Sequence, residues 1–196
     1  MPRKREGGHR LGSKRDSEVD AAVFEATRQL LVEKGYSATT IDGIAKLAEV
    51  GRPSIYRRWP SKAHIVNDTI HPAVLPRLDP AEDFAEEITR VVAGAISVFA
   101  DAATREAAPG LMNDVRSESS LRDALISGQL ATFAGELGQR ISAAVERGEA
   151  RPGLDANILI DIIAGAAIFA LSVRDVEDLE SLTSGLTEVL LRGILA

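Results

Sequence analysis

The segment from residue 39 to 62 predicts two short helices joined by a tight turn, and it constrains this chain more than any other feature. The first helix is indicated by apolar residues at helical spacing: Ile41, Ile44, Ala45 and Ala48. Thr40 can cap its N-terminus by accepting a hydrogen bond from a backbone N–H. Gly51 can cap the second helix, and Pro53 falls in its first turn, where a missing N–H costs nothing. The pattern predicts a helix-turn-helix motif.

The order of residues in this segment resembles the N-terminal domain of TetR-type transcriptional regulators. The resemblance runs over about residues 17–64 and is carried by three stretches: Thr–Ile–x–x–Ile–Ala, then Ala–x–Val, then Ile–Tyr–Arg–Arg–Trp–Pro–Ser–Lys. The chain departs from the family in the turn, where Glu49 replaces the usual Gly and Gly51 replaces the usual Ser. A non-glycine residue at positive φ costs roughly 1 kcal/mol, so we expect slight strain there or a turn shifted by one residue.

The resemblance implies which residues face DNA. Arg52 is expected to read a base directly, because its planar guanidinium can bond guanine O6 and N7 together, and Pro53 can pack against a thymine methyl. The other positions suit the groove or the phosphates, which place the protein without reading sequence. The full expected set is Thr40, Arg52, Pro53, Ser54, Tyr56, Arg57 and Lys62, with Arg58 suited to either role. The alternatives are a packed aromatic for Tyr56 and a merely solvated face for Arg57 and Arg58.

Charge is divided sharply along the chain. Residues 1–62 hold 13 Lys and Arg against 8 Asp and Glu, whereas residues 63–196 hold 10 against 21, and the net charge of the whole is −6. Polyphosphate attracts the first part and repels the second. We therefore expect DNA contacts to be confined to the N-terminal third, with the acidic remainder facing away from the duplex.

The sequence predicts three regions. Residues 1–16 are rich in Arg and Lys with little to bury, which predicts a disordered basic arm that either contacts DNA or is a solvated tail. Residues 17–62 form the helix-turn-helix domain, whose first helix should run from about Ser17 to Gly35. Trp59 is expected in a core between domains. Residues 63–196 form a larger helical domain for effector binding and dimerisation, linked through a helix from Ser61 to about His71.

The second domain is helical in period throughout, so the fold is predicted to be all-α with about nine helices. No strand is indicated. Pro109–Gly110 should bend or interrupt one helix, and the dipeptides His71–Pro72 and Asp79–Pro80 should break regular structure. The five expected helices are 81–100, 104–116, 121–147, 156–173 and 176–195.

The last two helices are expected to pair with those of a second copy. Residues 158–173 are apolar nearly all round, and such a helix needs cover on several sides. The resemblance implies a homodimer through these helices, and the alternative is a core within one chain. The residues expected at the interface are Gly165, Ala166, Ala167, Leu182, Leu186 and Val189. Because Asp161 interrupts the apolar stretch and its length falls short of a bilayer, no membrane span is expected.

The resemblance also implies a small-molecule effector of unknown identity, bound in a pocket of the second domain. Candidate lining residues are Ile96, Phe99, Met112, Phe133 and Phe169, with Asn113 and Gln129 as polar partners. The alternative for these apolar residues is ordinary core.

The expected function is sequence-specific binding of an inverted-repeat operator by a transcriptional regulator, by family default a repressor, released by its effector. The alternative is a DNA-binding protein of the same fold that acts in chromosome organisation or division. No catalytic triad, phosphate loop, metal set or cofactor motif is present, so no enzyme is expected. A metal sensor using His64 and His71 is a minor alternative. The absence of cysteines excludes disulfides, and the absence of an apolar signal peptide predicts a cytoplasmic location.

Overall fold

The computed structural model describes residues 10–70 and 83–195, and all regular structure in these two ranges is helical. The first range holds α1 (Arg10–Ala38), α2 (Ile41–Leu47), α3 (Arg52–Tyr56) and α4 (Lys62–Ile70). The second holds α5 (Phe84–Ala100), α6 (Ala102–Ser117), α7 (Ser119–Leu125), η1 (Ile126–Leu130), α8 (Ala131–Glu146), α9 (Ala156–Ile168), η2 (Phe169–Val173) and α10 (Leu179–Ile194). The all-α prediction is confirmed, with ten α-helices in the described residues where about nine were expected.

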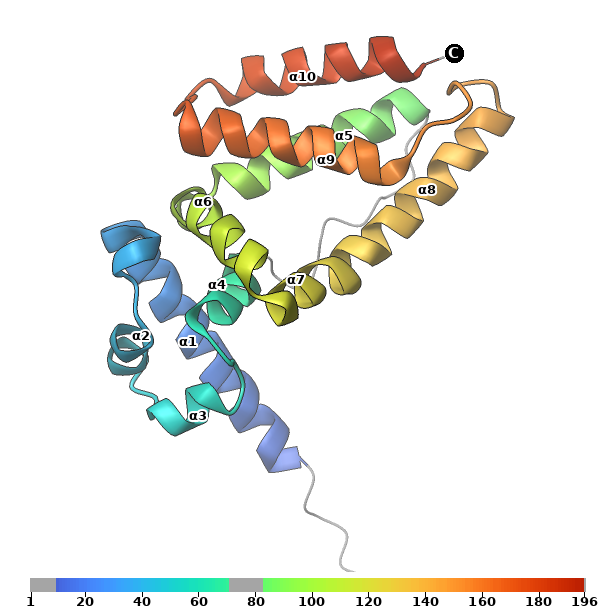
Figure 1. The fold of residues 1–196 in the computed structure, drawn as a ribbon. Helices are drawn as coiled ribbons and strands as arrows, with labels where there is room; N and C mark the ends of the chain where they lie inside the picture. Colours follow the sequence, from blue (N-terminus) through green and yellow to red (C-terminus); the bar gives the residue numbers. More distant parts are fainter. Residues whose placement is uncertain (1–9, 71–82, 196) are drawn as a thin grey trace, which may run out of the picture.

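The helices form two bodies that meet along α1, α4 and α6 (Figure 1). In the N-terminal body α2 and α3 lie beside the long α1. In the C-terminal body α9 and α10 both lie along α5, and α8 runs diagonally away from them (Figure 1). The core of this body is built mainly by α5, α8, α9 and α10, with Phe84, Ile88, Leu137 and Leu171 nearly inaccessible. Each body buries apolar residues of its own, and a further buried cluster joins the two bodies where α1 and α4 meet α6, with Leu31, Val66 and Leu111 among its members.

Helix α1 begins at Arg10, seven residues earlier than Ser17, so residues 10–16 of the predicted disordered arm are helical. The predicted C-terminal boundary is close to what is found, because Gly35 breaks the helical backbone with φ 74° and ψ 173°. Residues 1–9 of the arm, and both dipeptides expected to break structure near residues 71–80, lie outside the described residues.

The C-terminal helices follow the prediction with two differences. Helix α6 runs unbroken through Pro109, so the expected interruption is absent. The predicted helix over residues 121–147 is divided into α7, the π-helical segment η1 and α8, and the apolar helix from 156 to 173 likewise ends in the π-helical segment η2. Each π-helical segment is only five residues long and lies next to an α-helix, so periodicity averaged over the whole predicted helix did not indicate it.

Candidate nucleic-acid interface

The turn between α2 and α3 has the expected construction. Thr40 caps α2, its hydroxyl oxygen accepting a hydrogen bond from the Gly43 N–H at 3.1 Å. Glu49 adopts φ 54°, the left-handed region that a glycine would occupy without cost, so the turn has the positive φ that was expected at this position. Gly51 then caps α3 in an extended conformation, and Pro53 lies in its first turn. The local signals in the sequence therefore position both helices.

A small core holds α3 against α1 and α2. Ile44 of α2 and Ile55 of α3 are inaccessible to solvent, and they share one apolar cluster with Val23 of α1. Trp59 belongs to the same cluster, where its ring meets Phe24 edge-on at 5.6 Å between centroids. The prediction of a core tryptophan is confirmed, but it lies in the core of the N-terminal body.

Five of the seven predicted DNA contacts are exposed: Thr40 directly before α2, Arg52, Pro53 and Tyr56 on α3, and Arg57 directly after α3. Tyr56 is 54% exposed, which leaves about half of this residue accessible to a partner. Ser54 is half-buried. Arg57 forms no ion pair with any acid in the part of the chain that the structure describes. We call these five exposed residues the α2–α3 surface.

Two neighbouring basic residues are instead used within the protein. Arg58 is largely buried and forms ion pairs with Asp16 and with Asp20 of α1, the latter at 3.3 Å, so it ties α1 to the end of α3. Lys62 Nζ donates to the backbone carbonyl of Tyr36 at 2.9 Å and lies 3.9 Å from the centre of its ring. Burial lowers the pKa of Lys62, against the opposing effect of Asp114. Lys62 thus packs between α1 and α4, and its expected phosphate contact stays a prediction.

Arg52 has a partner that the sequence reasoning missed. Its Nε lies 3.0 Å from Oδ1 of Asp42 in the first turn of α2, and both side chains are more than half exposed, at 61% and 58%. The signal available in the sequence was an acidic residue two positions after the cap Thr40, on the helix that precedes α3. The guanidinium that is expected to contact a base is thus already paired with a carboxylate in the DNA-free protein.

Polar contacts connect the N-terminal body to α6 and α7, and we call this set the domain junction. The Tyr36 hydroxyl donates to Asp114 Oδ2 at 2.5 Å, and burial followed by Asp114 raises the pKa of Tyr36 well above its usual value. Ser61 donates to Glu118 at 3.2 Å, and its oxygen lies 2.9 Å from His64 Nδ1. The Ser61 side chain therefore connects the start of α4 to Glu118, the residue between α6 and α7.

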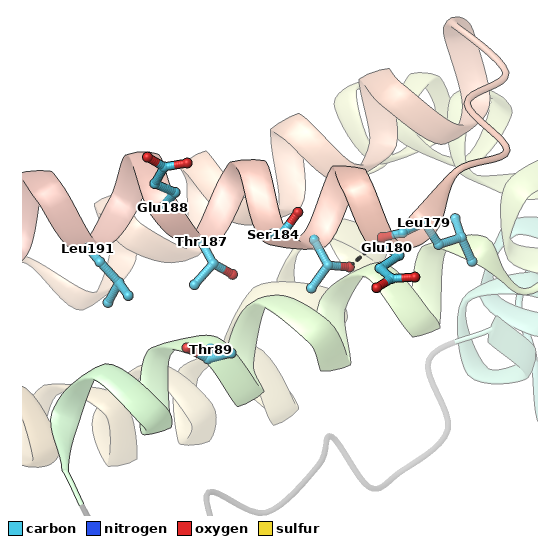
Figure 2. Close-up of a pocket in the computed structure, with 8 residues that line it drawn as sticks. Thr89, Leu179, Glu180, Ser184, Thr187, Glu188 and Leu191 are labelled. Carbon is cyan, nitrogen blue, oxygen red and sulfur yellow. Dashed lines mark hydrogen bonds between the residues drawn. The ribbon is translucent and has the colours of Figure 1, made fainter.

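The residues predicted to line an effector pocket lie in different environments. Ile96 is buried in the main core, Phe99 and Phe133 pack against that core, Met112 is half-buried and Phe169 is 56% exposed. An open groove of about 710 Å³ lies elsewhere, between α5 and α10 (Figure 2). Its lining residues are Thr89, Leu179, Glu180, Thr183, Ser184, Thr187, Glu188 and Leu191. None of the five predicted residues lines this groove.

Helix α9, the segment η2 that continues it and helix α10 expose large apolar side chains, which we call the α9–α10 surface: Ile158, Ile162, Phe169, Val173 and Val189. Of the predicted interface residues, Gly165 and Val189 are exposed, whereas Ala166, Leu182 and Leu186 are half-buried. Ala167 is fully buried in the core of its own chain, so its assignment to an interface is corrected. The small side chain allows close packing within the subunit.

The apolar helix Ala156–Val173 is long and apolar enough to cross a membrane by length and composition, with a mean hydropathy of 2.1. The prediction that it is too short for a span is therefore wrong on length. Of its residues 33% are buried, and it packs on α5 and α8 within the C-terminal body. Length and composition alone are weak evidence for a membrane segment, because core helices pass the same test.

Comparison with known proteins extends the resemblance over the whole chain. The family model described as bacterial regulatory proteins, tetR family, matches residues 23–69, and the tetracyclin repressor-like C-terminal domain matches residues 79–189. The HTH-type transcriptional regulator YdeS of Bacillus subtilis is 27% identical over 191 residues, covering 94% of each chain. The DNA-binding transcriptional repressor TetR of Mycobacteroides abscessus is 26% identical over 144 residues, covering 72% of this chain and 76% of its own.

Solved structures share the fold. NalD, the secondary repressor of the MexAB-OprM multidrug efflux pump in Pseudomonas aeruginosa, superposes with a TM-score of 0.66 at 22% identity, covering 92% of this chain and 98% of its own. Salmonella enterica GusR gives a TM-score of 0.65 at 16% identity, covering 96% and 98%. The chain shares with these structures an all-helical fold with an N-terminal helix-turn-helix domain. The chain belongs to the TetR family of bacterial transcriptional regulators.

Proposed function

We propose that this protein represses transcription by binding an inverted-repeat operator as a homodimer, with α3 in the major groove. The observation that carries the proposal is the α2–α3 surface, where Arg52, Tyr56 and Arg57 are exposed above a buried core that fixes the helix. An Arg at the start of α3 suits guanine, and the neighbouring hydroxyl and guanidinium groups suit phosphates. Basic charge in the N-terminal third attracts the duplex.

A homodimer formed through the α9–α10 surface supplies the second copy of α3, which we call the second reading head. Exposed apolar side chains at positions 158, 162, 169 and 173 recur along one face of the apolar helix, which is the pattern of a surface covered by a partner. Two-fold symmetry would bring the same face of each subunit together. Two copies of α3 would then meet successive major grooves, which requires half-sites about one helical turn apart, or a multiple of it.

Repression and release by a small molecule complete the proposal. Repression is supported by the relative from Mycobacteroides abscessus, which is a DNA-binding transcriptional repressor. Release is supported by the domain junction, because a displacement of α6 would pull on Tyr36 through its bond to Asp114. A hundredfold loss of operator affinity needs only about 2.7 kcal/mol of coupling between the two sites.

Selection of bound DNA from a random library tests the proposal, using the purified full chain at about physiological salt so that phosphate attraction alone does not dominate. We expect a compact inverted repeat. Arg52→Ala, selected in parallel, should lose about 1–3 kcal/mol of preference at one base pair in each half-site. Recovery of no motif, with binding that disappears as salt rises, would contradict sequence-specific reading.

Genome-wide occupancy distinguishes a transcriptional regulator from a DNA-binding protein of chromosome organisation or division. A regulator occupies few sites, close to promoters, whereas a protein of chromosome organisation or division occupies many dispersed sites. The predicted result is occupancy at a small number of promoters, with transcription of the adjacent genes rising when the protein is removed. Dispersed occupancy with unchanged transcription would favour the alternative.

A further inference from the structure

We propose that Asp42 is a positioning residue for base reading, which holds the Arg52 guanidinium by its Nε and leaves the edge formed by its two terminal nitrogens free for guanine. The inference rests on the proposed function, in which Arg52 reads a base. The Nε to Oδ1 distance is 3.0 Å, and the two residues come from different helices, α2 and α3. Asp42 would therefore act on specificity through Arg52.

The chemistry of the guanidinium makes this arrangement productive. Its planar fork carries five N–H donors, of which the Nε–H lies on one side and the terminal nitrogens form the end that pairs with O6 and N7 of guanine. A free arginine side chain samples many rotamers, and part of this conformational entropy is lost when the side chain binds. An ion pair formed before DNA binds already restricts these rotamers. Less entropy is then lost when the guanidinium bonds to guanine.

The charge of Asp42 has a second consequence. An exposed carboxylate on a DNA-facing helix is repelled by phosphates, and the Arg52 charge beside it offsets that repulsion. The pair together adds little net charge, so Arg52 contributes less to sequence-independent attraction than exposed Arg57 does. The pair is thereby expected to lower affinity for random DNA more than affinity for the operator, which raises discrimination.

A purely structural role for Asp42 makes a different prediction. Asp42 lies in the first turn of α2, where a negative charge stabilises a helix N-terminus. Removing that charge would lower the stability of the fold and would weaken binding to every DNA sequence alike. Discrimination between bases is therefore the readout that separates the two roles.

The test measures dissociation constants of the full-length protein for two duplexes. One is the selected operator, and the other carries a substitution at the base pair where Arg52→Ala loses preference. The variants are Asp42→Asn, which keeps the shape and removes the charge, and Asp42→Glu, which keeps the charge. Glu49→Gln is the matched control, because it removes one exposed acid from the adjacent turn, and no described ion pair connects Glu49 to Arg52.

We expect Asp42→Asn to reduce discrimination between the two duplexes by about 3–10-fold, a part of what one bidentate arginine contact provides. Binding to the substituted duplex should stay equal or become tighter. Asp42→Glu should restore part of the discrimination, and Glu49→Gln should tighten binding to both duplexes by the same factor. In an Arg52→Ala background, Asp42→Asn should have no further effect on discrimination.

Equal discrimination by Asp42→Asn and Glu49→Gln would overturn the positioning role, even with base reading by Arg52 intact. A loss of discrimination by Asp42→Asn in the Arg52→Ala background would also overturn it, because the effect would not pass through Arg52. If Arg52→Ala itself loses no preference at any base pair, the proposed reading by Arg52 fails first, and the inference falls with it.

Discussion

The α2–α3 surface and the α9–α10 surface are both exposed, yet they differ in the chemistry of their side chains and in the length of the helices that carry them. The first is small and carries arginine and hydroxyl groups on helices of five and seven residues, anchored by Ile44 and Ile55 beneath. The second exposes isoleucine, phenylalanine and valine on long helices that pack on α5. The first suits a polyanion and should weaken with salt, whereas the second suits another apolar surface and should not.

The same contrast appears among neighbouring basic residues. Arg57 is exposed, whereas Arg58, the next residue, is largely buried against two acids of α1. Lys62 is likewise drawn toward Tyr36. Basic character along a sequence therefore predicts a DNA-binding region, but the partners supplied by the fold decide which side chain is available.

The largest expected effect comes from charging the α9–α10 surface. Ile162→Glu with Val189→Glu places two carboxylates on side chains that are 46% and 70% exposed, so the subunit should fold but should not pair. Loss of the second reading head should weaken operator binding by about 100-fold or more. Light scattering gives the mass and anisotropy gives the affinity.

The control is Val32→Glu, which charges an apolar side chain of α1 that is 54% exposed. It should leave both the mass and the affinity unchanged. A charged α9–α10 variant that still has the mass of a dimer would contradict the assignment of this apolar surface to the contact between subunits.

The next effect tests the domain junction, which connects the two surfaces. A Cβ at Gly110 would lie 2.3 Å from Cδ1 of Tyr36, so Gly110→Ala should lower the free energy of unfolding by about 1–3 kcal/mol. Gly135→Ala is the matched control, because nothing lies within 4 Å of a Cβ at that helical position. It should be neutral or stabilising. Urea unfolding measures both, and equal behaviour of the two variants would contradict the close packing of Tyr36 on α6.

Salt dependence sharpens the contrast between Arg57 and Lys62. Each lost phosphate contact lowers the slope of log affinity against log salt by about 0.9, so Arg57→Ala should lower it by about 2 for the two subunits of a dimer. Lys62→Ala should leave the slope unchanged and reduce stability instead, because its ammonium bonds to Tyr36. Operator titrations at several salt concentrations measure this. A lower slope for Lys62→Ala would show that the Lys62 ammonium contacts a phosphate.

The smallest effect concerns the N-terminus of α6. Burial alone would raise the pKa of Asp101, but hydrogen bonds from Arg28 and Thr104 hold it below its usual value. Its stabilisation is therefore present at neutral pH and is lost as the pH falls through the lowered pKa. Asp101→Ala should cost about 0.5–1 kcal/mol at pH 7, as for other cap residues. The difference from the unaltered protein should shrink in unfolding experiments at pH 3, and a difference that grows on acidification would contradict the assignment.

The parts of the fold and site that could be predicted are those specified locally. The cap Thr40, the pair Gly51 and Pro53, and the break at Gly35 act on residues within one turn, so spacing was sufficient. The ion pairs of Arg58 and the contacts of Lys62 involve partners from 26 to 42 residues away, which no local pattern indicates.

Ala167 was misassigned for a related reason. A helix that is apolar nearly all round has no polar face, so the sequence does not show which side faces its own core. In the structure Ala167 faces the C-terminal core, whereas Ile162 and Phe169 are exposed. The predicted pocket residues are distributed over core and surface, because helical spacing does not distinguish a residue that lines a pocket from one in the core.

Hydrogen–deuterium exchange of the full chain, with and without the selected operator, tests the division between the two surfaces most directly. We predict that operator slows exchange in α2 and α3, whereas α9 and α10 are already protected in the free protein and lose this protection on dilution. Unchanged exchange in α2 and α3 on DNA binding, together with protection of α9 that appears only with DNA, would contradict the assignment of DNA to the first surface and a second subunit to the other.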